Sequence, residues 1–454
     1  MTSVSEKFGE WLEGLEAASI PEAPTNGAID TLIDTAGLSF AARDTDYMQA
    51  LVKGWESGEG KATVLGHAGG FDAITAAMIN GTAAHGEDFD NSYEGCPVHS
   101  GAVIVPAVLA IAEARGLTGE RAFTGIVAGI EIMCRMGQIT GTGAHKAGFH
   151  PTAIIGTMAA AGAVGVALGQ NRDQIANGFG LAGSMAAGII EYLADGSWTK
   201  RMHAGWAAQS GIRAATMAEA GFIGPKTVFE GTHGFYTAFA PSIEPDFDVL
   251  VSDLGQRWEA ANLSFKPYAC GTMCQPYVDC AIRMRDQITD IDAIASISCK
   301  VGEGTVHRLW APLELKQNPP TGYGAKFSGP YCLAIGLIDG DAGLAQFSEE
   351  KIHGKQVLEL ASKIAYDVDP DNEYPANYTG HMEITLKDGT TMTEFQPYLR
   401  GGTKEPLGRD AIIDKCHANL SFGGMANDRI SGFIETFETL ALQSDLSALR
   451  AFRG

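Results

Sequence analysis

The stretch from Pro151 to Gln170, PTAIIGTMAAAGAVGVALGQ, carries no charged residue. A second uncharged stretch, IANGFGLAGSMAAGII, runs from Ile175 to Ile190. Both approach the length of a membrane span, which requires about 20 strongly apolar residues. They are rich in Ala and Gly, however, and they contain Gln, Asn, Thr or Ser. We therefore predict two buried, closely packed stretches of a helical bundle and no membrane-spanning segment.

Helical patterns continue on both sides of this pair. Apolar residues recur with the 3.6-residue period of an amphipathic helix, and end signals flank several segments. Pro151 suits the first position of a helix, Ser100 suits an N-cap, and Gly116 suits the position after a helix. The resulting predicted helices cover residues 29–42, 70–85, 101–115, 121–139, 152–168, 173–194 and 204–220.

The pattern changes after residue 262. Residues 294–301 predict a short strand, and residues 381–386 and 391–396 predict a hairpin around the turn KDGT at 387–390. Helical patterns return between and after these strands. These predicted helices cover residues 275–286, 331–337, 348–364 and 408–440.

The length of 454 residues exceeds what one hydrophobic core usually serves, so two domains are expected. We predict a mainly α protein with a large all-helical domain and a smaller α+β domain. The helical domain covers residues 1–262, the α+β domain covers residues 263–403, and helices in residues 404–454 complete the helical domain.

Charge and cysteine usage narrow the function. The net charge of −22 argues against binding to nucleic acid or to an anionic membrane. A pocket for an anionic small molecule must then be locally basic, which draws attention to the few Lys and His residues. The spacing of Cys270, Cys274 and Cys280 matches neither a zinc site nor an iron–sulfur site. Reduced thiols and the lack of a visible signal peptide predict a cytoplasmic protein.

Three segments place a His or Lys just ahead of a predicted helix start. They contain His99, His150 and the pair Lys200/His203. A helix N-terminus offers unpaired N–H groups and a partial positive charge, both of which favour an anion. Three such segments predict a pocket for a small molecule with several carboxylates, lined by acid/base groups.

A polar loop follows the predicted helix 70–85. It contains His85, Asp88 and Asp90, which are spaced so that they could bind a metal ion. The simpler interpretation is a loop of hydrogen-bonding carboxylates, and we expect no metal here. A carboxylate beside a His or Lys stabilises the charged form of that residue.

At this point the chain resembles the MmgE/PrpD family, whose members include 2-methylcitrate dehydratase, cis-aconitate decarboxylase and iminodisuccinate epimerase. The resemblance extends over nearly the whole length and rests on motifs in the family's order. The motifs are N80-G-x-x-x-H-x-x-D-F-D, H99-S-G-A, G148-F-H-P-T-x-x-x-G, K200-x-x-H-x-G-x-A-A, K266-P-Y, A325-K-F-S-x-x-Y and L386-K-D-G.

The resemblance implies a large helical domain, a smaller lid domain and an active site in the cleft between them. It also implies a homodimer that needs no metal, iron–sulfur cluster or organic cofactor. The site residues that it implies are Asp88, Ser92, His99, His150, Lys200, Lys266 and Tyr331.

Two positions depart from the family pattern. The decarboxylase subgroup has a His five residues after the lid lysine, where this chain has Gly271. Many relatives have a His before a Pro a little further on, where this chain has Gln275. The lid therefore lacks an imidazole that relatives can use, which counts against a direct transfer of decarboxylase activity.

His150 is our first choice for the general base, because the start of a helix at Pro151 disfavours the imidazolium. His99 is a candidate acid or carboxylate ligand, and we expect Asp88 to orient or charge one of these imidazoles. Lys200 is expected to stabilise the enolate-like charge that forms when a proton next to a carboxylate is removed.

On the lid side, Lys266 is expected to bind a carboxylate, and Tyr331 to donate a hydrogen bond or act as a late acid. Ser92 supplies a hydroxyl on the loop, and Gln275 is a candidate specificity residue. His203 can either line the pocket or contact the residues that line it. The direction of its side chain stays open at this stage.

The function expected from these residues is a cofactor-independent lyase for a small di- or tricarboxylate, similar to 2-methylcitrate dehydratase. Reprotonation of the carbanion on its other face would give an epimerase or isomerase, as for iminodisuccinate. Decarboxylation of a cis-aconitate-like acid is a third outcome. A protein that binds carboxylates without turnover is the alternative outside enzymes.

Overall fold

The computed structural model describes residues 2–454, which divide into two compact units. The helical unit comprises the chain up to Gly86, Asp90–Ser264 and Ile412–Gly454. The smaller unit comprises Glu87–Phe89 and Phe265–Ala411. The sequence patterns placed the boundaries after residues 262 and 403, whereas this division falls after residues 264 and 411. They gave no sign that Glu87–Phe89 packs with the smaller unit.

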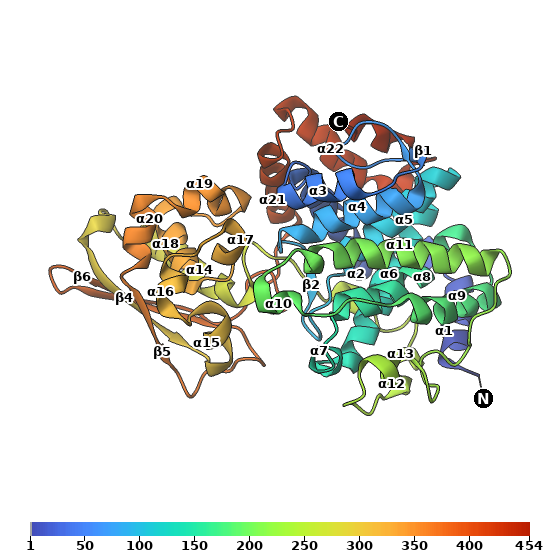
Figure 1. The fold of residues 1–454 in the computed structure, drawn as a ribbon, viewed down its shortest axis with the longest axis horizontal. Coiled ribbons are helices and arrows are strands. Elements are labelled where there is room, and N and C mark those ends of the chain that lie inside the picture. The colour runs from blue at the N-terminus through green and yellow to red at the C-terminus, as the bar shows by residue number, and fades with distance from the viewer. Residues whose placement is uncertain (1) are drawn as a thin grey trace. The chain divides into compact units, whose positions relative to one another are not determined.

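Helix α8 (Pro151–Leu168) forms the core of the helical unit. Helices α5, α6, α9 and α11 all pack against it (Figure 1). By length and composition it is apolar enough to cross a membrane, but 94% of it is buried inside the unit. This burial agrees with the prediction of a core helix. The other helices of the unit are α1 (Val4–Glu13), α2 (Glu22–Ala41), α3 (Asp46–Gly54), α4 (Ala73–Gly86), α5 (Ser100–Arg115), α6 (Gly119–Thr140), α7 (Gly143–Lys146), α9 (Arg172–Met185), α10 (Tyr192–Asp195), α11 (Thr199–Glu219), α12 (Phe235–Phe239), α13 (Phe247–Val251), α21 (Arg409–Phe422) and α22 (Asn427–Glu438).

Small residues explain how closely these helices pack. Pro151 is the first residue of α8, and Gly169 ends the helix in the left-handed conformation with φ of 69°. Gly211 of α11 lies so near α8 that an added Cβ would come within 2.3 Å of the Cβ of Ala160. The Gly and Ala content of Pro151–Gln170 therefore serves close helix contact, as predicted. The stretch Ile175–Ile190 is buried only in its first part, and Ile189 is 61% exposed.

Two helix predictions near the centre of the unit were wrong. The helix expected over residues 173–194 ends at Met185 and is followed by an irregular segment and the short α10. Gly188 has φ of 136° in this segment, which an α-helix cannot accommodate. Helix α11 begins at Thr199, ahead of the predicted start at residue 204. Lys200 and His203 therefore lie in the first turns of α11 and not before it.

The smaller unit contains a four-stranded sheet with strand order β5-β4-β6-β7. Strand β5 is parallel to β4, and the other pairs are antiparallel. Strands β4 (Ile294–Val301), β6 (Gly380–Leu386) and β7 (Thr391–Gln396) follow the predicted ranges closely. The helix predicted over 348–364 is instead α19 and α20, and its last residue begins β5 (Ile364–Val368). The helices of this unit are α14 (Gln275–Arg285), α15 (Glu303–Leu309), α16 (Leu313–Gln317), α17 (Gly322–Ala325), α18 (Gly329–Asp339), α19 (Glu349–Ile352) and α20 (Lys355–Ala361).

Three short strands in the helical unit escaped the sequence patterns. Strand β1 (Glu59–Ala62) precedes α4, and β2 (Ser92–Tyr93) pairs antiparallel with β3 (Leu263–Ser264). The β2–β3 pair joins the loop between α4 and α5 to residues 263–264. The chain as a whole is mainly α, as predicted.

Candidate active site

Four imidazoles from distant parts of the sequence form a continuous cluster in the helical unit. The ring centroids of His99 and His85 are 4.9 Å apart, those of His85 and His150 are 5.5 Å apart, and those of His150 and His203 are 5.3 Å apart. All four side chains belong to buried residues. The ring of Tyr192 packs against both His150 and His203. We call these four histidines the imidazole cluster.

Helix starts place two of these side chains. His150 is the N-cap of α8, as predicted from Pro151, and its backbone N–H donates to the carbonyl of Gly188 at 2.9 Å. His99 is the N-cap of α5, one residue earlier than the Ser100 cap that we predicted. Both rings therefore lie at the positive ends of buried helices, where an anion is favoured.

A single carboxylate, that of Asp90, contacts two of the imidazoles. Nδ1 of His85 lies 2.8 Å from Oδ2 of Asp90, and Nδ1 of His99 lies 3.3 Å from Oδ1. Nδ1 of His99 also lies 3.0 Å from the carbonyl oxygen of Asn91. We expected Asp88 to orient an imidazole, but in the structure Asp90 makes these contacts. A carboxylate on Nδ1 fixes the ring and leaves Nε2 as the reactive nitrogen.

His85, Asp90 and His99 also bring potential metal-ligand atoms within 4.8 Å of one another. The contact of His99 Nδ1 with the Asn91 carbonyl requires a hydrogen on that nitrogen, and a protonated nitrogen cannot bind a metal. Nε2 of His85 is buried without a hydrogen-bond partner. The geometry therefore fits oriented imidazoles that offer Nε2 to a ligand better than it fits a metal bound through Nδ1.

His150 and His203 face each other through the same ring nitrogen. Their Nδ1 atoms are 3.1 Å apart, within hydrogen-bond distance. When both rings are neutral, one Nδ1 must carry the hydrogen and the other must accept it. The donor ring then has a bare Nε2, which is a base, and the acceptor ring has a protonated Nε2, which is a hydrogen-bond donor. The pair of His150 and His203 therefore contains one base and one hydrogen-bond donor.

Burial keeps this part of the cluster uncharged. Burial, followed by repulsion from His85 and Lys200, holds the pKa of His150 well below its usual range. Burial and the same two neighbours lower the pKa of His203 to about 4. Burial also lowers the pKa of His85, although the Asp90 carboxylate opposes it. At neutral pH these imidazoles can therefore accept a proton.

Asp90 is charged in spite of its burial. Burial alone would raise its pKa, but the neighbouring His99 and His85 outweigh burial and hold the pKa well below its usual range. Lys200 supplies positive charge to the cluster, since it lowers the pKa of His85, His150 and His203. The cluster thus combines neutral bases with a cation able to attract a carboxylate.

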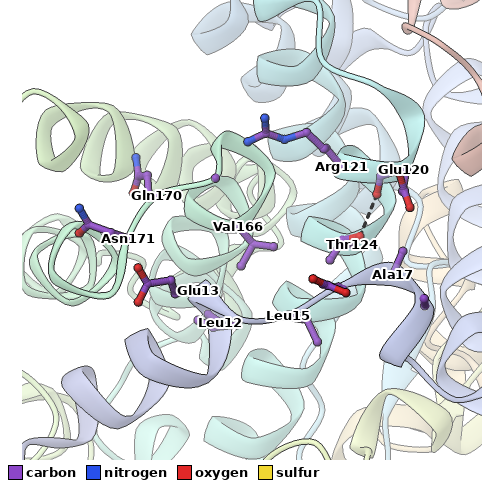
Figure 2. Close-up of a pocket in the computed structure, with 13 residues that line it drawn as sticks. Leu12, Glu13, Leu15, Ala17, Glu120, Arg121, Thr124, Val166, Gln170 and Asn171 are labelled. Atoms are coloured by element: carbon purple, nitrogen blue, oxygen red, sulfur yellow. Dashed lines mark hydrogen bonds between the residues drawn. The ribbon is translucent and has the colours of Figure 1, made fainter.

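A cavity of about 570 Å³ in the helical unit reaches one end of the cluster. His203 and Tyr192 line it together with Met202 and Trp206. Its volume suits a small organic acid. A second cavity in the same unit, of about 440 Å³, is lined by the end of α1, the start of α6 and the turn after α8 (Figure 2). No histidine or lysine lines that second cavity, so we do not place acid/base chemistry there.

In the smaller unit, Lys266 binds Asp88. Nζ of Lys266 donates to the Asp88 carbonyl oxygen at 2.7 Å and to Oδ1 at 2.9 Å, and the lysine is 3% exposed. Among residues 2–454, Asp88 alone combines a side chain with a positive φ, which is 56°. Lys266 is therefore a buried cation held by a carboxylate. Because a substrate carboxylate has the same chemistry as Asp88, Lys266 is suited to bind one.

The other predicted residues fall in both units. The buried Tyr331 donates its hydroxyl to the carbonyl of Gln346 at 2.5 Å, within the smaller unit. The buried Gln275 begins α14, and its Oε1 has no hydrogen-bond partner. Ser92 is buried in β2 of the helical unit and pairs with Ser264.

The predicted residues thus separate into two sets. The structure brings His99, His150, Lys200 and His203 together in the helical unit, and it pairs Asp88 with Lys266 in the smaller unit. His85 was not among the predicted site residues, and the predicted partner of an imidazole was Asp88, whereas the structure shows Asp90 in that place. The sequence does contain a signal for the pair of His85 and Asp90, because the two residues lie close together on either side of the end of α4.

Family models and curated relatives match nearly the whole chain. The model of the MmgE/PrpD N-terminal domain matches residues 6–248, and that of the C-terminal domain matches residues 268–438. The chain is 27% identical to cis-aconitate decarboxylase of Mus musculus, with 100% of this chain and 94% of that protein covered. It is 26% identical to cis-aconitate decarboxylase of Homo sapiens, with 99% and 94% covered. It is 24% identical to a cis-aconitate decarboxylase-like protein of Aspergillus oryzae, with 98% and 97% covered.

Proposed function

Because the chain belongs to the MmgE/PrpD family, we propose that it is a lyase acting on a small di- or tricarboxylate without a cofactor. The observation that carries this proposal is the neutral imidazole pair of His150 and His203 beside the cation Lys200. A neutral imidazole removes a proton next to a carboxylate, and a nearby ammonium stabilises the charge that develops.

The leading reaction is loss of water from a hydroxy acid such as 2-methylcitrate. Nε2 of His150 takes the proton from the carbon next to a carboxylate, and the electron pair moves toward that carboxylate, beside Lys200. The pair then forms the carbon–carbon double bond while the carbon–oxygen bond breaks. His99, in its doubly protonated form, gives the proton on Nε2 to the leaving hydroxide, so that water departs and the ring keeps its hydrogen on Nδ1. Lys266 binds a further carboxylate of the substrate.

The low pKa of His150 and His203 suits these imidazoles to the first step of the dehydration, in which a base removes a proton. His150 and His203 are neutral at pH 7, so each is better suited to accept a proton than to supply one. The bare Nε2 in the pair is the base in this scheme. Its partner keeps the ring in the required tautomer through the Nδ1 contact.

Decarboxylation is the second candidate, and the curated relatives favour it. In that reaction the bond to the carboxylate carbon breaks, carbon dioxide leaves, and an acid protonates the remaining carbanion. This chain has Gly271 and Gln275 where relatives can have histidines on the smaller unit. The absence of an imidazole at these two positions counts against this candidate.

Proton NMR of the purified protein in D₂O tests both candidates. The panel would contain 2-methylcitrate, citrate, cis-aconitate and iminodisuccinate. New alkene signals from a hydroxy acid would support dehydration, and itaconate-like signals from cis-aconitate would support decarboxylation. Deuterium incorporation next to a carboxylate without elimination would support an epimerase. Binding without any change in the acids would contradict the proposal of a lyase for these substrates.

A further inference from the structure

Two lysines of the smaller unit hold adjacent residues in the same way. Lys266 donates to the carbonyl and the carboxylate of Asp88, as described above. Nζ of Lys326 donates to the carbonyl oxygen of Glu87 at 2.7 Å and to its Oε2 at 2.6 Å. Lys326 is 2% exposed, and the Glu87 side chain is 17% exposed. Each lysine therefore binds one carbonyl and one carboxylate of the segment Glu87–Phe89.

This segment needs such support. The left-handed backbone of Asp88 is unfavourable for a residue with a Cβ, and it persists only where contacts impose it. The segment is also covalently tied to the imidazole cluster, because His85 lies three residues before Asp88 and Asp90 lies two residues after it. A shift of the segment would therefore disturb the carboxylate that orients two imidazoles.

The proposed function assigns Lys266, but not Lys326, to the substrate. If Lys266 binds a substrate carboxylate, that carboxylate competes with Asp88 for the same ammonium group. The Glu87 pair involves no residue assigned to the substrate. It can therefore stay intact while Lys266 changes partner.

We propose that Lys326 is a positioning residue: its pair with Glu87 holds the segment Glu87–Phe89 in place when Lys266 engages a substrate carboxylate. This inference rests on the proposed function, because it assigns Lys266 to the substrate. Lys326 is the lysine of the A325-K-F-S motif.

The test compares Lys326→Met with Lys266→Met. We expect Lys326→Met to lower kcat about tenfold or more and to keep KM within about threefold, because the substrate ligand remains but the reactive groups are misplaced. We expect Lys266→Met mainly to raise KM. Glu87→Gln is a milder way to break the same pair and serves if Lys326→Met does not fold. Lys326→Arg should recover most of the activity.

Lys316→Met is the matched control. Lys316 is a half-buried lysine of the same unit that donates to the carbonyls of Arg308 and Phe327. It should leave kcat and KM near the wild-type values. A folded Lys326→Met protein with unchanged kcat would overturn the proposal. A rise in KM alone would also overturn it, since Lys326 would then act as a substrate ligand.

Amide hydrogen exchange separates this proposal from the proposed function. Lys326→Met should speed exchange in a peptide covering residues 86–91, with or without turnover of any acid. Adding tricarballylate, an unreactive tricarboxylate, should leave that peptide protected in the wild type and expose it further in Lys326→Met. Unchanged exchange in the variant would contradict the positioning role even in an active enzyme. An inactive wild type with increased exchange in Lys326→Met would contradict only the lyase.

Discussion

The imidazole cluster of the helical unit and the buried lysines Lys266 and Lys326 of the smaller unit differ in charge and in pairing. In the helical unit, burial lowers the pKa of His85, His150 and His203, so these imidazoles are uncharged at neutral pH. In the smaller unit, the buried Lys266 and Lys326 each bind a carboxylate. A buried imidazole can accept a proton only when it is neutral, whereas a buried lysine keeps its charge when a carboxylate binds it.

Under the proposed function, the imidazole cluster exchanges protons and Lys266 binds an anion. Groups that exchange protons need a pKa below the working pH, and desolvation supplies it. Groups that bind anions need their charge and a partner that a substrate carboxylate can replace. Asp88 is such a partner for Lys266.

The largest effect is expected for His150→Gln, which removes the proposed base. We expect kcat to fall about 1000-fold with little change in KM, as is typical when a general base is lost. Steady-state kinetics with the substrate found in the NMR panel measure this change. His67→Gln is the control, because His67 belongs to the same unit but not to the imidazole cluster. A loss below tenfold would show that another group removes the proton.

The next largest effect is expected when the buried cation Lys266 is removed. Lys266→Met leaves Asp88 without this partner and removes a ligand for a substrate carboxylate. Truncating one member of a buried charge pair typically costs about 2–5 kcal/mol, so we expect KM to rise about 100-fold. Titration calorimetry with tricarballylate provides an independent reading of the same loss. Unchanged affinity would remove Lys266 from the substrate site.

Stability should depend on pH through the neutral imidazoles. The folded-state pKa of His203 is lowered from 6.5 to about 4, so its stabilising contribution is complete above pH 6.5. That contribution is lost as the pH falls from 6.5 toward 4, because the unfolded chain binds the proton more tightly. The loss amounts to about 3 kcal/mol for this residue. Urea unfolding of the wild type and of His203→Gln should show a shallower decline in the variant. Equal declines would contradict the low pKa.

A smaller effect is expected at the carboxylate that orients the rings. Asp90→Asn keeps the size of the side chain but removes its charge and one acceptor oxygen. We expect kcat to fall about 10- to 100-fold, as is typical for a group that orients a catalytic imidazole. The acid limb of the pH–rate profile should move as well, since the charge that Asp90 supplies is lost. Asp88→Asn should leave that limb in place and change KM instead.

The smallest effect is expected at Gly271. An added Cβ there would lie 3.0 Å from Cδ1 of Phe327, so the ring must shift slightly. We expect Gly271→His to cost about 1–3 kcal/mol of stability. If decarboxylation needs an imidazole here, the variant should gain activity on cis-aconitate. No gain would mean that the missing histidine is not what separates this chain from decarboxylation.

Local signals made much of the fold predictable. Pro151 fixed the start of α8 and placed His150 at its N-cap, because proline strongly favours the first helical position. The hairpin of β6 and β7 followed from alternation on either side of the turn at residues 387–390, in which Gly389 has φ of 88°. The uncharged Ala/Gly stretch correctly predicted a buried core helix.

Features that depend on distant contacts were not predictable in this way. Strand β5 pairs in parallel with β4, and no local pattern encodes a partner so far away. The D-F-D spacing places Asp88 and Asp90 on one loop, but periodicity cannot tell which carboxylate contacts an imidazole. The start of α11 at Thr199 lacked a capping signal, so Lys200 and His203 were placed outside the helix.

A ¹⁵N NMR titration of the protein labelled at histidine nitrogens directly tests whether the buried imidazoles are neutral, with His150→Gln and His203→Gln used for assignment. We expect neither ring to titrate near pH 6.5 and the ring of His203 to stay neutral from pH 8 to about pH 5, with one ring carrying its hydrogen on Nδ1 and the other on Nε2. Titration of either ring near pH 6.5 would contradict this expectation, because an imidazole that gains charge there is not the desolvated base on which the proposed chemistry depends.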